Sequence, residues 1–286
     1  MSEFVRIFEM GPRDGLQNEK RLVPVAEKIR LVEMLSDCGL QKIEATSFVS
    51  PRWVPQMADA AEVMAGIRRA PGVVYAGLVP NLKGYEAARA AKADEVAVFA
   101  SASETFSHRN INCSIAESLE RFRPVLAAAA ADGIPVRGYV SCVTDCPYEG
   151  PIPPAAAVKV VAELLAIGCY EISLGETIGQ GTPTTIAAML DALLEEVPAG
   201  RLAGHYHDTG ARALENILVS LEKGVRTFDA AVGGLGGCPF APGAKGNVDT
   251  LAVAATLADR GYETGLDVGR LEKATRFASS LREEWP

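Results

Sequence analysis

The sequence repeats one unit eight times over 286 residues: a short apolar or β-branched run followed by a longer stretch whose apolar residues have helical spacing. The strand-like runs lie at 4–10, 42–45, 73–78, 95–100, 135–141, 170–174, 201–207 and 226–231. The helix-like stretches lie at 25–38, 56–69, 82–91, 115–131, 155–167, 185–195, 212–223 and 248–259. This regular alternation predicts the α/β class and a closed parallel (β/α)8 barrel, or TIM barrel, ringed by helices.

Glycines mark the ends of several of these helices. They stand at Gly39, Gly133, Gly168 and Gly224, where a helix commonly stops in a left-handed conformation. After the eighth helix, residues 266–285 have the pattern of an amphipathic tail helix. With no Ser/Gly-rich linker, we expect one domain over 1–286, with the barrel at about 3–262. An open doubly wound sheet is the alternative, but eight equal units favour a closed barrel.

The composition limits the classes of partner that this chain is expected to bind. The chain carries 28 Lys+Arg and 36 Asp+Glu, a formal charge of −8, which argues against nucleic acid or an anionic membrane as the main partner.

No apolar run approaches the ~18 residues of a membrane-spanning helix, and the first ten residues lack a leader pattern. The six cysteines include no CxxC pair, and CxxxC at 142–146 has no second pair to complete a zinc site. We expect a reduced, cytoplasmic protein.

A barrel brings the loops that follow its strands to one face, where active residues gather. The loop after the first strand contains Arg13 and Asp14 between glycines and a proline. From this loop alone, a solvated turn with a salt bridge is as good an interpretation as an active pair.

The seventh strand ends in Gly-His-Tyr-His-Asp. Strand alternation places His205 and His207 on the same side, and two imidazoles facing one way suit a divalent metal. A hydrogen-bonded pair of core histidines is the alternative. Asp208 points the other way, and we expect it to orient a histidine or to cap the next helix.

The loop after the eighth strand, 233–247, contains six glycines and is neither a Walker loop nor a dinucleotide-binding fingerprint. Cys238 in this loop is either a spare thiol or a functional one. Asn247 could cap the last helix or supply an amide oxygen to a metal. Further polar side chains stand at other strand ends: Glu44, Ser101, Ser103, Tyr139, Ser141 and Glu176.

Several stretches together carry a family resemblance. They are GPRDGLQNEK, IEATSFVSPRWVPQMAD, SASETFSHRNINCSI, GYVSCVTDCPYEG, EISLGETIGQGTP, HYHDT and GGLGGCPFAPGAKGN. The chain resembles the 3-hydroxy-3-methylglutaryl-CoA (HMG-CoA) lyases, metal-dependent TIM-barrel enzymes, from about Arg6 to the end of the eighth unit. The GLGGCPFA loop is the most specific of these signals.

The resemblance implies a metal site and a reaction. Mg²⁺ or Mn²⁺ would be held by Asp14, His205, His207 and Asn247. The reaction would be the retro-Claisen cleavage of HMG-CoA to acetoacetate and acetyl-CoA, as in leucine degradation or ketone-body formation. Such an enzyme would take a small acyl-CoA substrate and form a homodimer.

The same resemblance implies roles for individual side chains. Arg13 would face the thioester carbonyl, and Cys238 would close over the site and help to protonate the leaving enolate. Glu44 would shape the site and Tyr139 would act near the acyl group. The remaining substrate contacts that we expect are Gln17, Ser47 and Ser103.

One position departs from the family. Where the family commonly has Asp, this chain has Glu176, one methylene longer, and a shift on that scale can cost much of a rate. His205 and Glu176 are the candidates for the general base.

Other functions stay open at this stage. They are a lyase for a longer 3-substituted glutaryl-CoA, an aldolase or Claisen synthase of the same superfamily, and a non-catalytic barrel. The sequence does not decide which basic residue meets the CoA phosphates among Lys20, Arg52, Lys83 and Arg109.

Overall fold

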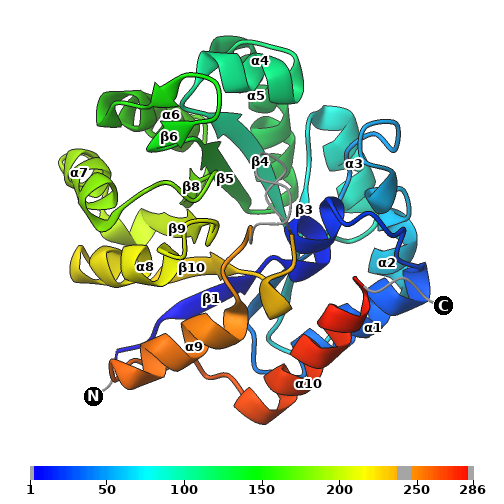
Figure 1. Cartoon of the computed structure of the whole chain (residues 1–286). Helices are drawn as coiled ribbons and strands as arrows, with labels where there is room; N and C mark the ends of the chain where they lie inside the picture. The colour runs from blue at the N-terminus through cyan, green and yellow to red at the C-terminus, as the bar shows by residue number, and fades with distance from the viewer. Residues whose placement is uncertain (1–2, 237–245, 283–286) are drawn as a thin grey trace.

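A computed structural model describes residues 3–236 and 246–282. Eight parallel strands close into a barrel in the order β1-β10-β9-β8-β5-β4-β3-β2, and β1 pairs with both β2 and β10 (Figure 1). Their bounds are β1 (Arg6–Glu9), β2 (Lys42–Ser47), β3 (Val74–Leu78), β4 (Glu95–Ser101), β5 (Val136–Ser141), β8 (Ile172–Glu176), β9 (Leu202–Tyr206) and β10 (Thr227–Ala230). The predicted (β/α)8 barrel is confirmed, and each strand overlaps a predicted run.

Helices cover the outside of the barrel. They are α1 (Val25–Ser36), α2 (Ala60–Gly66), α3 (Leu82–Ala90), α5 (Ile115–Asp132), α6 (Pro154–Ala166), α7 (Pro183–Leu194), α8 (Ala213–Glu222) and α9 (Thr250–Asp259). Local chemistry sets several ends: Ser114 and Glu117 form a capping box at the start of α5, and Gly133 ends it with φ +69°. The other three glycines predicted as helix stops also have positive φ.

Some short elements were not predicted. They are α4 (Glu104–Ile111), the π-helical turn η1 (Gly11–Gly15), the hairpin β6 (Asp145–Cys146) and β7 (Gly150–Pro151), and the 3-10 turns η2 (Pro55–Met57), η3 (Ala199–Arg201) and η4 (Val232–Gly234). They are too short to show a hydrophobic period. The predicted helix at 56–69 is also wrong in part, because η2 and α2 divide it.

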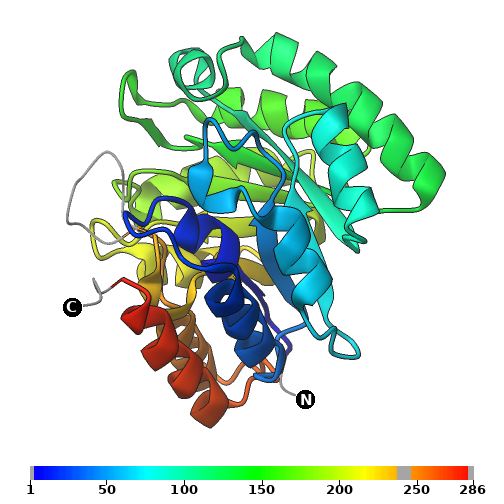
Figure 2. The same ribbon diagram turned by 90° about the vertical axis from the view of Figure 1, so that its right-hand side faces the viewer.

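The tail helix α10 (Val268–Ser280) lies beside α1 and η4, as Figures 1 and 2 show. Its buried face consists of Leu271, Ala274 and Ala278. One continuous apolar core extends from Val5 to Leu281 between the strands and the helices. Within the described residues, none of the helices combines the length and apolarity needed to cross a bilayer.

The barrel interior contains a smaller apolar cluster of Phe8, Met10, Ala76, Leu78, Ala97 and Tyr139. Polar side chains lie above it, at the carboxyl ends of the strands. The fold therefore places the polar strand ends around one mouth, as a TIM barrel requires for an active site.

Candidate active site

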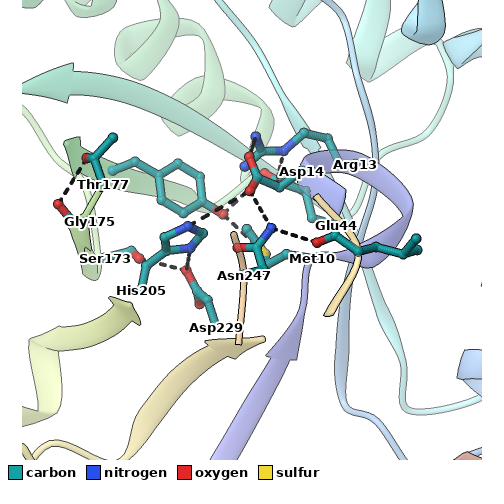
Figure 3. A network of polar contacts seen from close by, with 12 residues as sticks. Met10, Arg13, Asp14, Glu44, Ser173, Gly175, Thr177, His205, Asp229 and Asn247 are labelled. Atoms are coloured by element: carbon teal, nitrogen blue, oxygen red, sulfur yellow. Dashed lines mark hydrogen bonds and ion pairs between the residues drawn. The ribbon is translucent and has the colours of Figure 1, made fainter. Parts of the chain in front are cut away.

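A cavity of about 730 Å³ opens at the carboxyl-terminal mouth of the barrel. Its inner wall carries charged and imidazole side chains from elements far apart in the chain (Figure 3). The predicted site residues that line it are Arg13, Asp14, Gln17, Tyr139, His205, His207 and Asn247. Its volume is within the range of small-molecule sites.

Arg13 is fixed in η1, the turn that follows β1. Its side chain is only 7% exposed; Nε donates to Oε2 of Glu44 and Nη1 lies 2.5 Å from Oδ1 of Asp14. The salt bridge considered from the sequence does form, but it is buried rather than solvated. Burial alone would lower the pKa of Arg13, but the charges of Glu44 and Asp14 outweigh it and raise the pKa. The site therefore holds a permanent positive charge at a defined position.

Asp14, His205 and His207 form a compact set of metal-ligand types. One potential ligand atom from each lies within 4.8 Å of the others, and the two imidazole ring centroids are 5.5 Å apart. The histidines share a side of the strand, as alternation predicts.

The pKa values of Asp14 and His207 are both shifted by their surroundings. Burial would raise the pKa of Asp14, but Arg13 and the histidines lower it well below its usual range. Burial and the neighbouring His205 lower the pKa of His207 to about 4. Asp14 is therefore ionised and His207 neutral near pH 7, the forms that bind metal.

Asn247 joins this set through the backbone. Residues 207 and 247 form an antiparallel β-bridge, and Nδ2 of Asn247 donates to Oδ2 of Asp14 at 2.8 Å. The N-cap of α9 is Asp249, so Asn247 does not cap that helix. The structure thus brings together all four residues expected to bind metal.

The donor set fits a divalent cation. It contains one carboxylate, two imidazoles and one amide, and Nδ1 of His207 is buried with no hydrogen-bond partner among the residues described. Oxygen and imidazole ligands suit Mg²⁺ or Mn²⁺.

Glu44 and Tyr139 complete the wall beside Arg13. Glu44 is fully buried, and its Oε1 accepts a hydrogen bond from the Tyr139 hydroxyl at 3.2 Å. The guanidinium carbon of Arg13 lies 5.6 Å from the centre of the Tyr139 ring. Glu44 therefore orients both Arg13 and Tyr139 rather than lining the cavity itself.

Sequence reasoning missed two charged residues beneath the mouth, Arg137 and Asp229. Nδ1 of His205 lies 3.2 Å from Oδ2 of Asp229, and Nη1 of Arg137 donates to the same oxygen at 3.0 Å. The available signal was the single charged residue within each of two short strands, VRGYVS and TFDA. Asp208 accepts a hydrogen bond from the backbone of Ala213, the first residue of α8, although the N-cap position of that helix is Arg212.

Glu176 lies on the other side of its strand. It is in register with Tyr206, whose hydroxyl contacts Ser220 on α8, so both side chains point away from the barrel interior. Its Oε1 accepts from the backbone of Gln180 at 3.0 Å, and burial raises its pKa. Glu176 is not among the residues that line the cavity, and its role as a base stays a prediction from the sequence.

Two expected substrate contacts, Ser47 and Ser103, are not among the residues that line the cavity. Oγ of Ser47 accepts from the backbone of Val49, and Ser103 caps α4. Of the basic residues considered for the CoA phosphates, only Arg109 lines the cavity. Cys238 lies outside the described residues.

Comparisons with known proteins show the family to which this chain belongs. The family model described as HMGL-like matches residues 4–278. The mitochondrial hydroxymethylglutaryl-CoA lyase of Gallus gallus is 60% identical over 96% of this chain and 92% of its own. A 3-hydroxy-3-isohexenylglutaryl-CoA/hydroxy-methylglutaryl-CoA lyase of Pseudomonas aeruginosa is 57% identical over 94% of this chain and 90% of its own. The crystal structure of the HMG-CoA lyase from Brucella melitensis superposes with a TM-score of 0.98 at 66% identity, covering 99% of this chain and 100% of that one. The chain belongs to the HMGL-like family.

Proposed function

We propose that this enzyme is an HMG-CoA lyase, which cleaves HMG-CoA to acetoacetate and acetyl-CoA with the help of a divalent cation. The observation that carries the proposal is that a buried arginine adjoins a set of metal-ligand types within one cavity. Neither part alone would specify this reaction. Together, Arg13 and a bound cation would place positive charge beside each of the two fragments that the cleavage produces.

The reaction is a retro-Claisen cleavage. A base removes the proton of the tertiary hydroxyl, that oxygen becomes the ketone of acetoacetate, and the electrons of the broken carbon–carbon bond form the enolate of acetyl-CoA. Arg13 donates to the enolate oxygen, where negative charge develops. A proton then returns to the enolate carbon, and Cys238 is the proposed donor. Of the two bases considered from the sequence, His205 lines the cavity and Glu176 does not, and His205 can accept this proton only where its Nε2 is not bound to the cation.

Asp14, His205, His207 and Asn247 would hold the cation, Mg²⁺ or Mn²⁺. When bound, it would polarise substrate oxygens as a Lewis acid. Tyr139 and Gln17 contribute to the wall against which the acyl group would lie.

The outer cavity suits the CoA moiety. Arg109 and Arg121 line it and offer positive charge to phosphates, and Trp53, which is 83% exposed, lies on the rim. We propose Arg109 as a phosphate contact. The homodimer and the cytoplasmic location stay predictions from the sequence.

A lyase for longer 3-substituted glutaryl-CoA thioesters is the second candidate. The cavity extends over the apolar side chains of Leu78, Phe99 and Phe122, which could accommodate a hydrocarbon substituent. The Pseudomonas relative, whose name includes an isohexenyl substrate, is nearly as similar as the Gallus enzyme.

The decisive experiment uses metal-stripped full-length protein with HMG-CoA, with and without Mg²⁺ or Mn²⁺. Mass spectrometry should detect acetoacetate and acetyl-CoA only when metal is added. 3-Hydroxy-3-isohexenylglutaryl-CoA in a parallel assay tests the second candidate by comparison of kcat/KM. Folded, metal-loaded protein that releases neither product from HMG-CoA would refute the first proposal.

A further inference from the structure

Asp229 lies beneath the cavity, on the strand next to the one that carries His205. The two residues are in register between β10 and β9, and Oδ2 of Asp229 lies 3.2 Å from Nδ1 of His205 (Figure 3). The Asp229 side chain is fully buried and does not line the cavity. It can therefore act on a ligand only indirectly, and among the described residues that line the cavity its hydrogen-bond contact is His205.

The same carboxylate is held by other donors. The Ser173 hydroxyl donates to Oδ2 at 2.7 Å, Nη1 of Arg137 donates to Oδ2 at 3.0 Å, and Nη2 of Arg137 lies 2.9 Å from Oδ1. Arg137 is itself fully buried, and its Nε donates a hydrogen bond to Oε2 of Glu171 at 2.8 Å. Asp229 is thus an ionised group in a fixed orientation, surrounded by donors.

An ionised carboxylate accepts hydrogen bonds and cannot donate them. The contact with His205 therefore requires a proton on Nδ1, and a neutral imidazole then carries its lone pair on Nε2. Nε2 lies on the cavity side of the ring, 3.9 Å from Oδ2 of Asp14. Only this tautomer offers a lone pair to a cation between His205 and Asp14.

We propose that Asp229 is a positioning residue that keeps Nδ1 of His205 protonated and presents Nε2 to the cavity as a metal ligand. The inference rests on the metal site of the proposed function. Carboxylates that orient metal-binding histidines typically account for a 10–100-fold change in metal affinity.

A matched pair of variants separates this role from support of the barrel core. Asp229→Asn and Glu171→Gln each remove one negative charge from the surroundings of Arg137, but only Asp229 contacts His205. Mn²⁺ affinity, measured by electron paramagnetic resonance on the full chain, should fall about 10–100-fold in D229N and change little in E171Q. Circular dichroism checks that both variants are folded.

The outcomes distinguish the two proposals. Wild-type protein that binds no Mn²⁺ would refute the metal site itself. If wild type binds Mn²⁺ and D229N binds it equally well, or if both variants weaken it to the same extent, Asp229 has no specific role.

A second measurement needs no variant at position 229. The chain has three histidines, so long-range ¹H–¹⁵N spectra can resolve each ring, with His108→Ala and His207→Ala used for assignment. At a pH where the ring of His205 is neutral, the metal-free wild type should show the proton of His205 on Nδ1. A proton on Nε2 instead would overturn the proposal, even if D229N failed to fold.

Discussion

The amide nitrogen of Asn247 lies 2.8 Å from Oδ2 of Asp14, although 233 positions separate the two residues in the chain. Asp14 follows the first barrel strand and Asn247 precedes the last barrel helix, so the contact forms only once the barrel has closed. Metal binding at this point should therefore depend on the geometry of both loops, and it offers a direct measure of whether the mouth is correctly assembled.

The positive charge of Arg13 can be tested by Arg13→Met. Loss of the donor to the enolate oxygen should lower kcat by about 10³-fold or more. Arg123→Met, at an exposed helix position paired with Glu120, is the matched control and should keep wild-type activity. An R13M enzyme within about tenfold of wild type would remove Arg13 from the mechanism.

The metal ligands can be tested by His207→Ala. Because His207 is one of three clustered ligand residues, the variant should retain less Mn²⁺ or Mg²⁺ after dialysis, as measured by elemental analysis. His108→Ala, on the exposed surface of α4, removes an imidazole elsewhere and should leave metal content unchanged. Equal metal content in H207A and wild type would exclude His207 as a ligand.

The backbone of the glycine-rich loop can be tested by Gly236→Ala. A Cβ at this position would lie 2.8 Å from Nδ2 of Asn247, and the residue has φ +90°. We expect weaker Mn²⁺ binding and a lower kcat, because Asn247 must move. Gly72→Ala introduces a similar backbone strain at φ +81°, but its Cβ would have no atom within 4 Å. This variant should therefore be less stable and keep its metal affinity. Equal metal affinity in both variants would contradict this reading of the loop.

The thiol of Cys238 can be tested by Cys238→Ser, which should fold normally and lose turnover. Cys169→Ser is the comparison, because Cys169 is fully buried in the apolar core and a hydroxyl there should lower Tm. If C238S instead unfolds at a lower temperature while its turnover persists, the cysteine is structural.

The pH dependence of stability can be tested at Glu9. Burial outweighs its hydrogen bonds to Thr250, Val232 and Gly11 and raises its pKa from 4.5 to about 7. Between pH 4.5 and about 7 the Glu9 side chain has lost its proton in the unfolded chain but keeps it in the folded chain. The free energy of unfolding therefore falls as pH rises, by up to about 3 kcal/mol, and this loss is complete above pH 7.

Glu9→Gln mimics the protonated side chain: its oxygen can accept from the backbone of Gly11 and Val232, while its amide donates to Thr250. Urea unfolding from pH 4 to 8 should show wild type losing stability relative to E9Q as pH rises. A difference between the two proteins that does not vary with pH would show that folding does not shift the pKa of Glu9.

The sequence by itself determined the elements and the face on which chemistry occurs. Hydrophobic period and glycine stops are local properties, so the eight strands and their main helices could be predicted from neighbouring residues. Alternation within one strand was enough to put His205 and His207 on the same side, because both belong to one short segment. The resemblance then associated Asp14 and Asn247 with them.

Only the tertiary structure decided how neighbouring strands combine their side chains. Asp229 meets His205 because β10 and β9 pair in that register, and Arg137 reaches Asp229 from a third strand. Glu176 was expected at the mouth together with Glu44, which lies within β2 and contacts Arg13, yet the side chain of Glu176 points away from the barrel interior. The side of the barrel wall that a side chain faces, the strand register and the long-range charge contacts all depend on closure of the whole barrel. No local stretch of sequence contains that information.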